Sequence, residues 1–152
     1  MDTLEYRGAS SAARYVEEQI AGQNQFLRKS SAFGVEHLIR EELAEVWDEC
    51  SEPDWDGYDA LPVSFEAVLN AKRLLQTLPL GARLPSIGAV PSGNVSLEWH
   101  HSRRRSLTVT VTPEGELHYA ALLGPERTCG TAVFFDETPR TILDLIARVY
   151  GC

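Results

Sequence analysis

The chain has few of the features that define several common protein classes. Its 152 residues include only three cysteines, and no apolar run approaches the roughly 18–20 residues that a membrane-spanning helix requires. The cysteines, Cys50, Cys129 and Cys152, are odd in number and widely spaced, which predicts neither a disulfide framework nor a zinc site. The N-terminus lacks a basic start followed by an apolar stretch. We therefore expect no secretory signal, no membrane partner, and a cytoplasmic location in a reducing compartment.

The signatures of common enzyme classes are also missing. The sequence contains no nucleophile elbow, no zinc-protease helix motif, no phosphate-binding loop and no dinucleotide fingerprint. No cysteine has a histidine close to it in the sequence that could serve as a base. The carboxylates Asp54, Asp56 and Asp59 begin like a calcium loop, but the twelfth position is Phe65 where a glutamate ligand is needed. We therefore expect no catalytic residue, no metal and no cofactor.

Negative charge is the most informative bulk property. The formal net charge is −8, and residues 1–60 hold 14 acids and 5 bases, whereas residues 61–152 hold 8 acids and 9 bases. An acidic chain repels phosphate backbones, so direct nucleic-acid binding is unexpected. The run Arg103, Arg104 and Arg105 could grip phosphate, but a solvated turn or a contact with the acidic part of a second copy is the preferred interpretation. The imbalance favours a basic protein partner.

The first third of the chain has helical periodicity. A short helix is expected within 10–20, a break at 29–31, and a better-defined helix over 34–50, where apolar residues recur every three or four positions. These signals predict an N-terminal helical extension over residues 1–33. They also predict a single domain over residues 34–152.

Two further helices are expected after a loop. Proline and glycine punctuate residues 51–63, which predicts the loop. Ser64 is expected to cap the next helix, which ends before Pro79. Thr138 is expected to cap the last helix, with Pro139 at its first position.

The second half changes to a period of two, which is typical of strands with one buried face. Alternation predicts strands over residues 95–100, 107–112 and 117–121, and the apolar residues of 131–135 predict a fourth. The connections are short, so the strands must form an antiparallel meander. The expected fold class is α+β, a two-layer sandwich of N-terminal helices, a four-stranded antiparallel meander sheet and a C-terminal helix.

One stretch resembles a known family. Its motifs are Trp55-Asp56-Gly57-Tyr58-Asp59-Ala60, then Pro85-Ser86, then Gly93-Asn94-Val95-Ser96-Leu97-Glu98-Trp99. They resemble, over residues 53–124, a family of small uncharacterised bacterial proteins with a Trp-Asp-Gly-Tyr-x-Ala loop. That family usually has Gly at the position of Asp59; if a positive φ is required there, Asp tolerates it better than most residues, at some cost. The resemblance implies no enzymatic activity and an accessory, partner-neutralising role of the kind found near mobile elements or toxin–antitoxin pairs.

The loop and the acidic helix each have a structural and a functional interpretation. The loop can be a tight turn with packed aromatics or a pair of anchors for a partner, and the helix can carry a solvated face or a docking surface. The functional interpretation predicts a non-enzymatic interaction module, an antitoxin-, immunity- or anti-defence-like inhibitor of a basic nuclease, toxin or DNA-binding protein. The expected docking residues are Glu41, Glu42, Glu45, Asp48, Glu49, Trp55, Asp56 and Tyr58.

Two other functions remain open. The chain could be a small enzyme or ligand-binding module that uses the sheet face, with Glu98, His100 or His118 as polar groups. That function requires a concave pocket with convergent side chains. Alternatively, the chain could be a self-associating structural protein that forms a homodimer.

Overall fold

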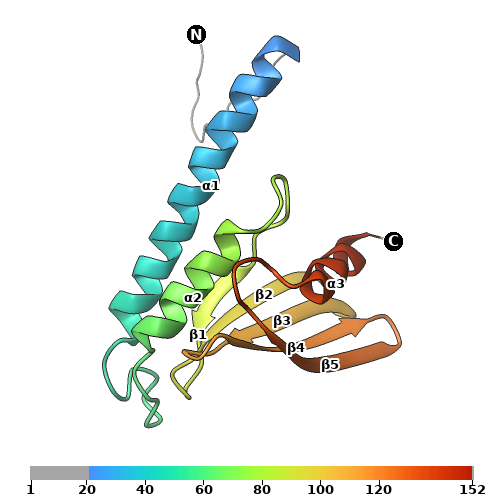
Figure 1. Cartoon of the computed structure of the whole chain (residues 1–152). Coiled ribbons are helices and arrows are strands. Elements are labelled where there is room, and N and C mark those ends of the chain that lie inside the picture. The colour runs from blue at the N-terminus through green and yellow to red at the C-terminus, as the bar shows by residue number, and fades with distance from the viewer. Residues whose placement is uncertain (1–20, 152) are drawn as a thin grey trace. The chain divides into compact units, whose positions relative to one another are not determined.

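The computed structural model describes residues 21–151, with side chains from Gly34 onward. The elements in these residues are α1 (Ala21–Cys50), α2 (Phe65–Gln76), β1 (Ser86–Ala89), β2 (Val95–Ser102), β3 (Arg105–Val111), β4 (Glu116–Leu123), β5 (Glu126–Val133) and α3 (Arg140–Tyr150) (Figure 1). The chain divides into two units, and the second begins at His37, within α1. Among the described residues, none of the helices combines the length and hydrophobicity needed to cross a membrane.

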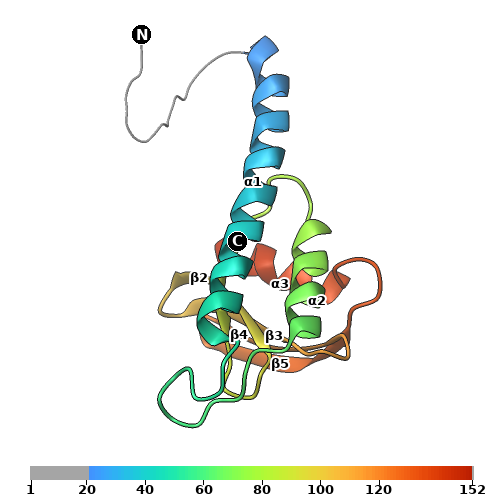
Figure 2. The ribbon, with the colours of Figure 1, turned by 90° about the vertical axis from the view of Figure 1, so that its left-hand side faces the viewer.

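The five strands form one antiparallel sheet whose spatial order is the chain order. The register runs straight across it, so that Leu97 opposes Val109, Val109 opposes Tyr119, and Tyr119 opposes Gly130. Both α2 and α3 contact the same side of this sheet (Figures 1 and 2). We call this side the helix-covered face and the opposite side the open face. The expectation of an α+β fold with an antiparallel meander is therefore confirmed.

The apolar core lies between the helix-covered face and the helices. Its largest fully buried side chains come from β2, β3, β4, α2 and α3, and Trp99 is the bulkiest of them. The indole Nε1 of Trp99 donates to the carbonyl oxygen of Arg83 at 2.8 Å, so its one polar atom is satisfied. Asn70 on α2 donates to the carbonyl oxygens of Thr112 and Pro113, which fixes the turn after β3 to α2.

The expected count of four strands is wrong because β1 was missed. β1 has only four residues, contains Gly88 and shows no alternation of buried and exposed side chains, so it gives no period-two signal. The strand expected over residues 131–135 is β5, which begins at Glu126 and ends at Val133. Most of its residues are exposed, so its first half lacks the alternation of apolar and polar residues that predicts a strand.

The break expected at 29–31 is also wrong, since α1 continues through these residues to Cys50. The segment holds Lys and two Ser, and neither Gly nor Pro, so it lowers helix propensity only slightly. The short helix expected within 10–20 falls outside the residues that the structure describes.

The two expected helix caps have different outcomes. Ser64 Oγ accepts a hydrogen bond from the amide of Ala67 at 3.3 Å, which confirms Ser64 as the cap of α2. Thr138 makes no capping bond to α3, and Pro139 occupies the cap position before Arg140, so that prediction is wrong. Its buried hydroxyl instead donates to the carbonyl oxygen of Leu74 at 3.2 Å and lies 2.7 Å from Thr77 Oγ1. The side chain therefore ties the start of α3 to the end of α2.

Candidate functional site

The carboxylates predicted to dock a partner share one side of α1. At about 100° per residue, their positions fall within an arc of about 120°. All five are exposed, whereas the residues on the opposite side are buried. We call this set the acidic face, and it consists of Glu41, Glu42, Glu45, Asp48 and Glu49. The buried side consists of Ile39, Leu43, Val46 and Cys50.

Little positive charge neutralises the acidic face. His37 Nε2 lies 3.0 Å from Glu41 Oε2, one helical turn away. In the described part of the chain, the other four carboxylates have no ion-pair partner. Glu45 is also four residues from both Glu41 and Glu49, so like charges repel along the helix at a cost of a few tenths of a kcal/mol per pair. A cationic partner would relieve this repulsion.

One apolar side chain lies within the acidic face, and two others lie outside it near the end of α1. Leu38 is 49% exposed and, by helical position, lies within the same arc one turn before Glu42. Trp47 and Phe65 are both partly exposed and form an edge-to-face pair with ring centroids 5.5 Å apart, so the end of α1 packs beside the start of α2. An interface on this part of the molecule could therefore combine charge with buried apolar area.

The loop after α1 uses most of its polar groups internally. Asp56 Oδ1 accepts hydrogen bonds from the amides of Tyr58 at 2.8 Å and Ala60 at 3.1 Å. Trp55 Nε1 donates to the carbonyl oxygen of Leu61 at 2.8 Å. Trp55 and Asp56 therefore hold the loop in shape, whereas Tyr58 stands out from it with 88% of its surface exposed.

Three residues in this loop have left-handed backbone conformations. Gly57 has φ of 79°, and the two aspartates Asp54 and Asp59 have φ of 62° and 66°. The condition considered for Asp59, a positive φ, is met, and the amide of Asp59 donates to Asp54 Oδ1 at 2.6 Å. The left-handed conformation is costly for the two aspartates, and the hydrogen bonds within the loop offset that cost.

The loop is anchored at both ends. The amide of Val63 donates to the carbonyl oxygen of Cys50 at 2.7 Å, and the amide of Leu61 donates to that of Pro91 at 2.8 Å. Gly93 lies so close to the loop that an added Cβ would be 3.0 Å from the carbonyl oxygen of Pro62. The end of α1 and the base of the loop are therefore held together by main-chain contacts.

The residues of the alternative site lie on the open face. Glu98 and His100 are exposed on β2, and His118 is exposed on β4. His118 Nδ1 lies 3.1 Å from Thr131 Oγ1, and His118 Nε2 lies 3.5 Å from a carboxylate oxygen of Glu116. These contacts bind His118 to its neighbours and do not bring it to Glu98 or His100.

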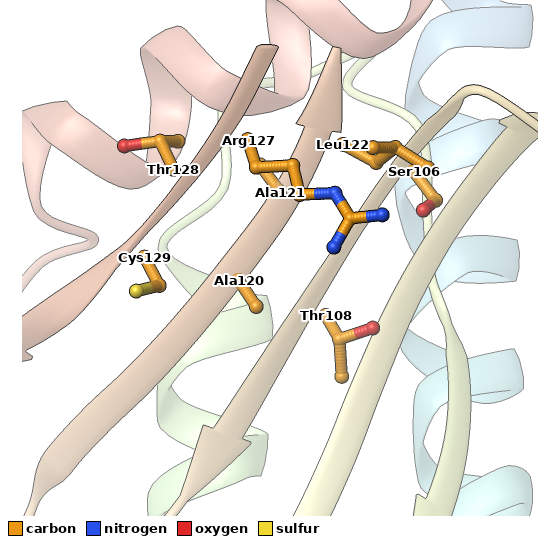
Figure 3. A pocket seen from close by; sticks show the side chains of 8 residues that line it. All are labelled: Ser106, Thr108, Ala120, Ala121, Leu122, Arg127, Thr128 and Cys129. Carbon is orange, nitrogen blue, oxygen red and sulfur yellow. The ribbon is translucent and has the colours of Figure 1, made fainter. Parts of the chain in front are cut away.

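The open face does contain a hollow of about 400 Å³ (Figure 3). Its lining residues are Ser106, Thr108, Ala120, Ala121, Leu122, Arg127, Thr128 and Cys129. None of the three polar residues predicted for a sheet-face site is among them. The sequence pattern does not indicate this hollow, because it predicts the start of β5 five residues too late and so leaves Arg127 and Cys129 outside the sheet.

The described cysteines and carboxylates give no indication of a catalytic thiol or a metal site. Burial, and to a lesser degree the negative charge of Glu49, raise the pKa of the Cys50 thiol, which disfavours the reactive thiolate. Cys129 is free and exposed on the edge strand. Within residues 21–151, no group of three or more His, Cys, Asp or Glu residues is placed to hold a metal ion.

Comparisons with known proteins identify no relative of the chain. No family model, no curated protein and no solved structure matches the chain. The resemblance of the Trp55–Ala60 motif to a bacterial family therefore stays a prediction.

Proposed function

We propose that the chain is a non-enzymatic protein-interaction module that docks a basic partner through the acidic face of α1. The observation that carries this proposal is the set of five exposed carboxylates on one arc, four of them without a cation in the described chain. Tyr58, on the internally hydrogen-bonded loop that follows α1, supplies an exposed aromatic anchor. Because Trp55 and Asp56 use their polar groups in hydrogen bonds within the loop, their role in this proposal is to hold Tyr58 in place.

Electrostatics favours one class of partner. A toxin, nuclease or DNA-binding protein that grips phosphate presents a positively charged surface, and an acidic helix face is complementary to it. The function proposed is therefore that of an antitoxin-, immunity- or anti-defence-like inhibitor. We further propose a cytoplasmic location, because the free thiols of Cys50 and Cys129 suit a reducing compartment.

The proposal is tested by capture of the partner with charge-matched variants. The tagged wild-type chain is compared with the triple variant Glu41→Lys, Glu45→Lys, Glu49→Lys in pull-downs from host lysate, read by mass spectrometry. A second triple variant, Glu114→Lys, Asp136→Lys, Glu137→Lys, changes the net charge equally at other exposed sites. We expect the wild type and this control to retain one basic protein at low salt and to release it at high salt. Equal capture by the acidic-face variant would contradict the proposal.

The hollow on the open face is the observation that favours a second function, a small-ligand-binding module. Ala120 is one of its lining residues and lies opposite Cys129 across the β4–β5 pair. A thermal-shift screen with the wild type and with Ala120→Leu, which fills the hollow, tests this function. A compound that stabilises the wild type and not the filled variant would support it, and the absence of any such compound would leave the interaction module as the better account.

A further inference from the structure

The outer edge of β5 leaves main-chain hydrogen-bonding groups without a strand partner. β5 pairs with β4 along one side, and no strand in residues 21–151 lies along the other. Hydrogen-bonded and non-hydrogen-bonded residue pairs alternate along an antiparallel ladder. The amide of Phe134 donates to the carbonyl oxygen of Gly115 at 2.9 Å, which identifies one hydrogen-bonded pair just beyond the end of β5.

This single bond fixes the orientation of every peptide group in β5. Since the pair types alternate from Phe134 backwards, the even-numbered residues of β5 form hydrogen-bonded pairs with β4. The odd-numbered residues of β5 form the non-hydrogen-bonded pairs. The N–H and C=O groups of these residues therefore point away from β4, toward the outside of the sheet. The residues are Arg127, Cys129, Thr131 and Val133.

β5 has few of the usual protections of an edge strand. It is eight residues long, contains no proline, and pairs with β4 without a bulge. Its only charged residues, Glu126 and Arg127, lie together at its first end. An edge with these properties is a template for the addition of another strand.

We propose that the strand added to this edge is β5 of a second copy of the chain. A two-fold axis perpendicular to the sheet pairs the two β5 strands antiparallel and sets helix-covered face beside helix-covered face. The result is one continuous sheet with five strands from each copy. We place the axis at Cys129, so that this residue faces Cys129 of the second copy in a hydrogen-bonded pair.

Charge is compatible with this register. Arg127 lies opposite Thr131 of the second copy, and Glu126 lies opposite Ala132 of the second copy. No like charges face each other, whereas an axis at Arg127 would set two guanidinium groups in opposition. The charges at the first end of β5 therefore disfavour the register centred there.

Two hydroxyl groups favour a second copy over an unrelated strand. A Cβ added at Gly130 would lie 2.5 Å from Tyr119 Oη, so the Tyr119 ring covers Gly130 and carries its hydroxyl over β5. Among the described residues, neither Tyr119 Oη nor Thr128 Oγ1 has a hydrogen-bond partner. With the axis at Cys129, Gly130 lies opposite Thr128 of the second copy. The Tyr119 hydroxyl of each copy then lies near the Thr128 hydroxyl of the other copy, and the two-fold axis produces this contact twice.

The first experiment measures the mass of the chain in solution. Sedimentation equilibrium of the wild type over a concentration series should give a dimer, twice the 16.9 kDa of one chain. Thr131→Pro removes an N–H that points outward and makes no bond to β4, so this variant should fold and be a monomer. Cys129→Lys, which sets two ammonium groups against each other at the axis, should also be a monomer. The control Glu114→Lys, outside β5, should remain a dimer.

A monomeric wild type, or a dimer that persists in Cys129→Lys, would overturn the proposal whether or not the proline variant folds. The inference does not rest on the proposed function, because no residue of the acidic face belongs to β5. The triple variant at Glu41, Glu45 and Glu49 should accordingly remain a dimer at low and high salt. Loss of the dimer in that variant would place self-association on the acidic face and contradict the β5 interface.

The second experiment tests the register by oxidation with diamide. Cα atoms in a hydrogen-bonded antiparallel pair are about 5.5 Å apart, which a disulfide can span. In a chain with Cys152→Ser, the two Cys129 thiols should form a covalent dimer on a non-reducing gel, while the oxidant takes up their protons and electrons. In a chain with Cys152→Ser, Cys129→Ser and Thr131→Cys, the new thiols lie about 13 Å apart along the strands and should not link. Equal cross-linking of both chains, or none from Cys129, would overturn the register.

Discussion

The acidic face and the loop that follows it are neighbours in the sequence, but they use their carboxylates in opposite ways. In the loop, Asp54 and Asp56 accept main-chain hydrogen bonds from residues of the same loop. On α1, Glu45 and Asp48 have no such partner in the described chain. A carboxylate whose lone pairs are used internally contributes to stability, and one without a partner is free to bind another molecule. The sequence pattern predicts one docking surface that joins Asp56 to the carboxylates of the acidic face, and the structure separates Asp56 from them by this criterion.

Replacing Asp56 should have the largest effect on stability. Asp56→Ala removes the acceptor of two amide hydrogen bonds, and we expect the free energy of unfolding to fall by about 1.5–3 kcal/mol. Urea denaturation followed by circular dichroism measures the change. The matched control is Asp48→Ala on the acidic face, for which we expect a change within about 0.5 kcal/mol. Similar losses in both variants would remove the distinction between the two regions.

Asp59→Gly should stabilise the chain. The left-handed conformation at φ of 66° costs a residue with a Cβ about 1 kcal/mol, and glycine avoids that cost at the expense of some entropy in the unfolded chain. We expect the free energy of unfolding to rise by about 0.5–1 kcal/mol. Calorimetry of Asp59→Gly and Asp59→Ala gives the comparison, and the alanine variant should be destabilised. An alanine variant as stable as the glycine variant would show that the conformation at this position is not strained.

Glu45→Lys should also stabilise the chain, but for an electrostatic reason. It turns two repulsive pairs, with Glu41 and Glu49, into attractive ones, which should raise the free energy of unfolding by about 0.5–1 kcal/mol. The same change should weaken capture of the basic partner. Glu45→Gln should give about half the gain in stability and a smaller loss of binding. A destabilised lysine variant would imply that Glu45 has an internal role like that of Asp56.

Tyr58→Ala should have the smallest effect on stability. A side chain that is 88% exposed contributes little to the core, so we expect a change of no more than about 0.5 kcal/mol in the free energy of unfolding. Partner capture should fall severalfold if Tyr58 is an anchor, whereas Tyr58→Phe should retain most of it. Undiminished capture by the alanine variant would limit the docking surface to the acidic face.

The central part of the fold follows from the sequence because its strands have one buried and one exposed face. β2 and β3 alternate between apolar and polar residues, and the structure buries Val95, Leu97 and Trp99 together on the helix-covered face. The edge strands β1 and β5 do not alternate as β2 and β3 do, and the helix contacts of the sheet are concentrated on β2, β3 and β4. They are identified as strands only by their pairing with neighbouring strands, which a period-two sequence pattern does not predict.

The candidate site was predictable to a similar extent. Helical spacing alone places Glu41, Glu45 and Glu49 on one side of a helix, and the structure leaves that side exposed. Which carboxylates are consumed by the loop depends on the path of the backbone through Asp54 and Asp59. Thr138 shows the same difference, because a hydroxyl before a helix was expected to cap it and instead bonds to Leu74, far away in the sequence.

The strand order of the sheet has a consequence for the order of folding. Because each strand pairs with the next one along the chain, every hairpin closes a short loop, and the sheet can assemble without waiting for distant segments. Thr77 precedes all five strands in the sequence and Thr138 follows them, so the contact between their hydroxyl groups joins two distant segments of the chain. Before the strands pair, this contact would have to close a loop across 61 residues, so we expect it to form after them. In refolding monitored by hydrogen exchange, we therefore expect the amides of β2 to β4 to gain protection first and those of α3 last.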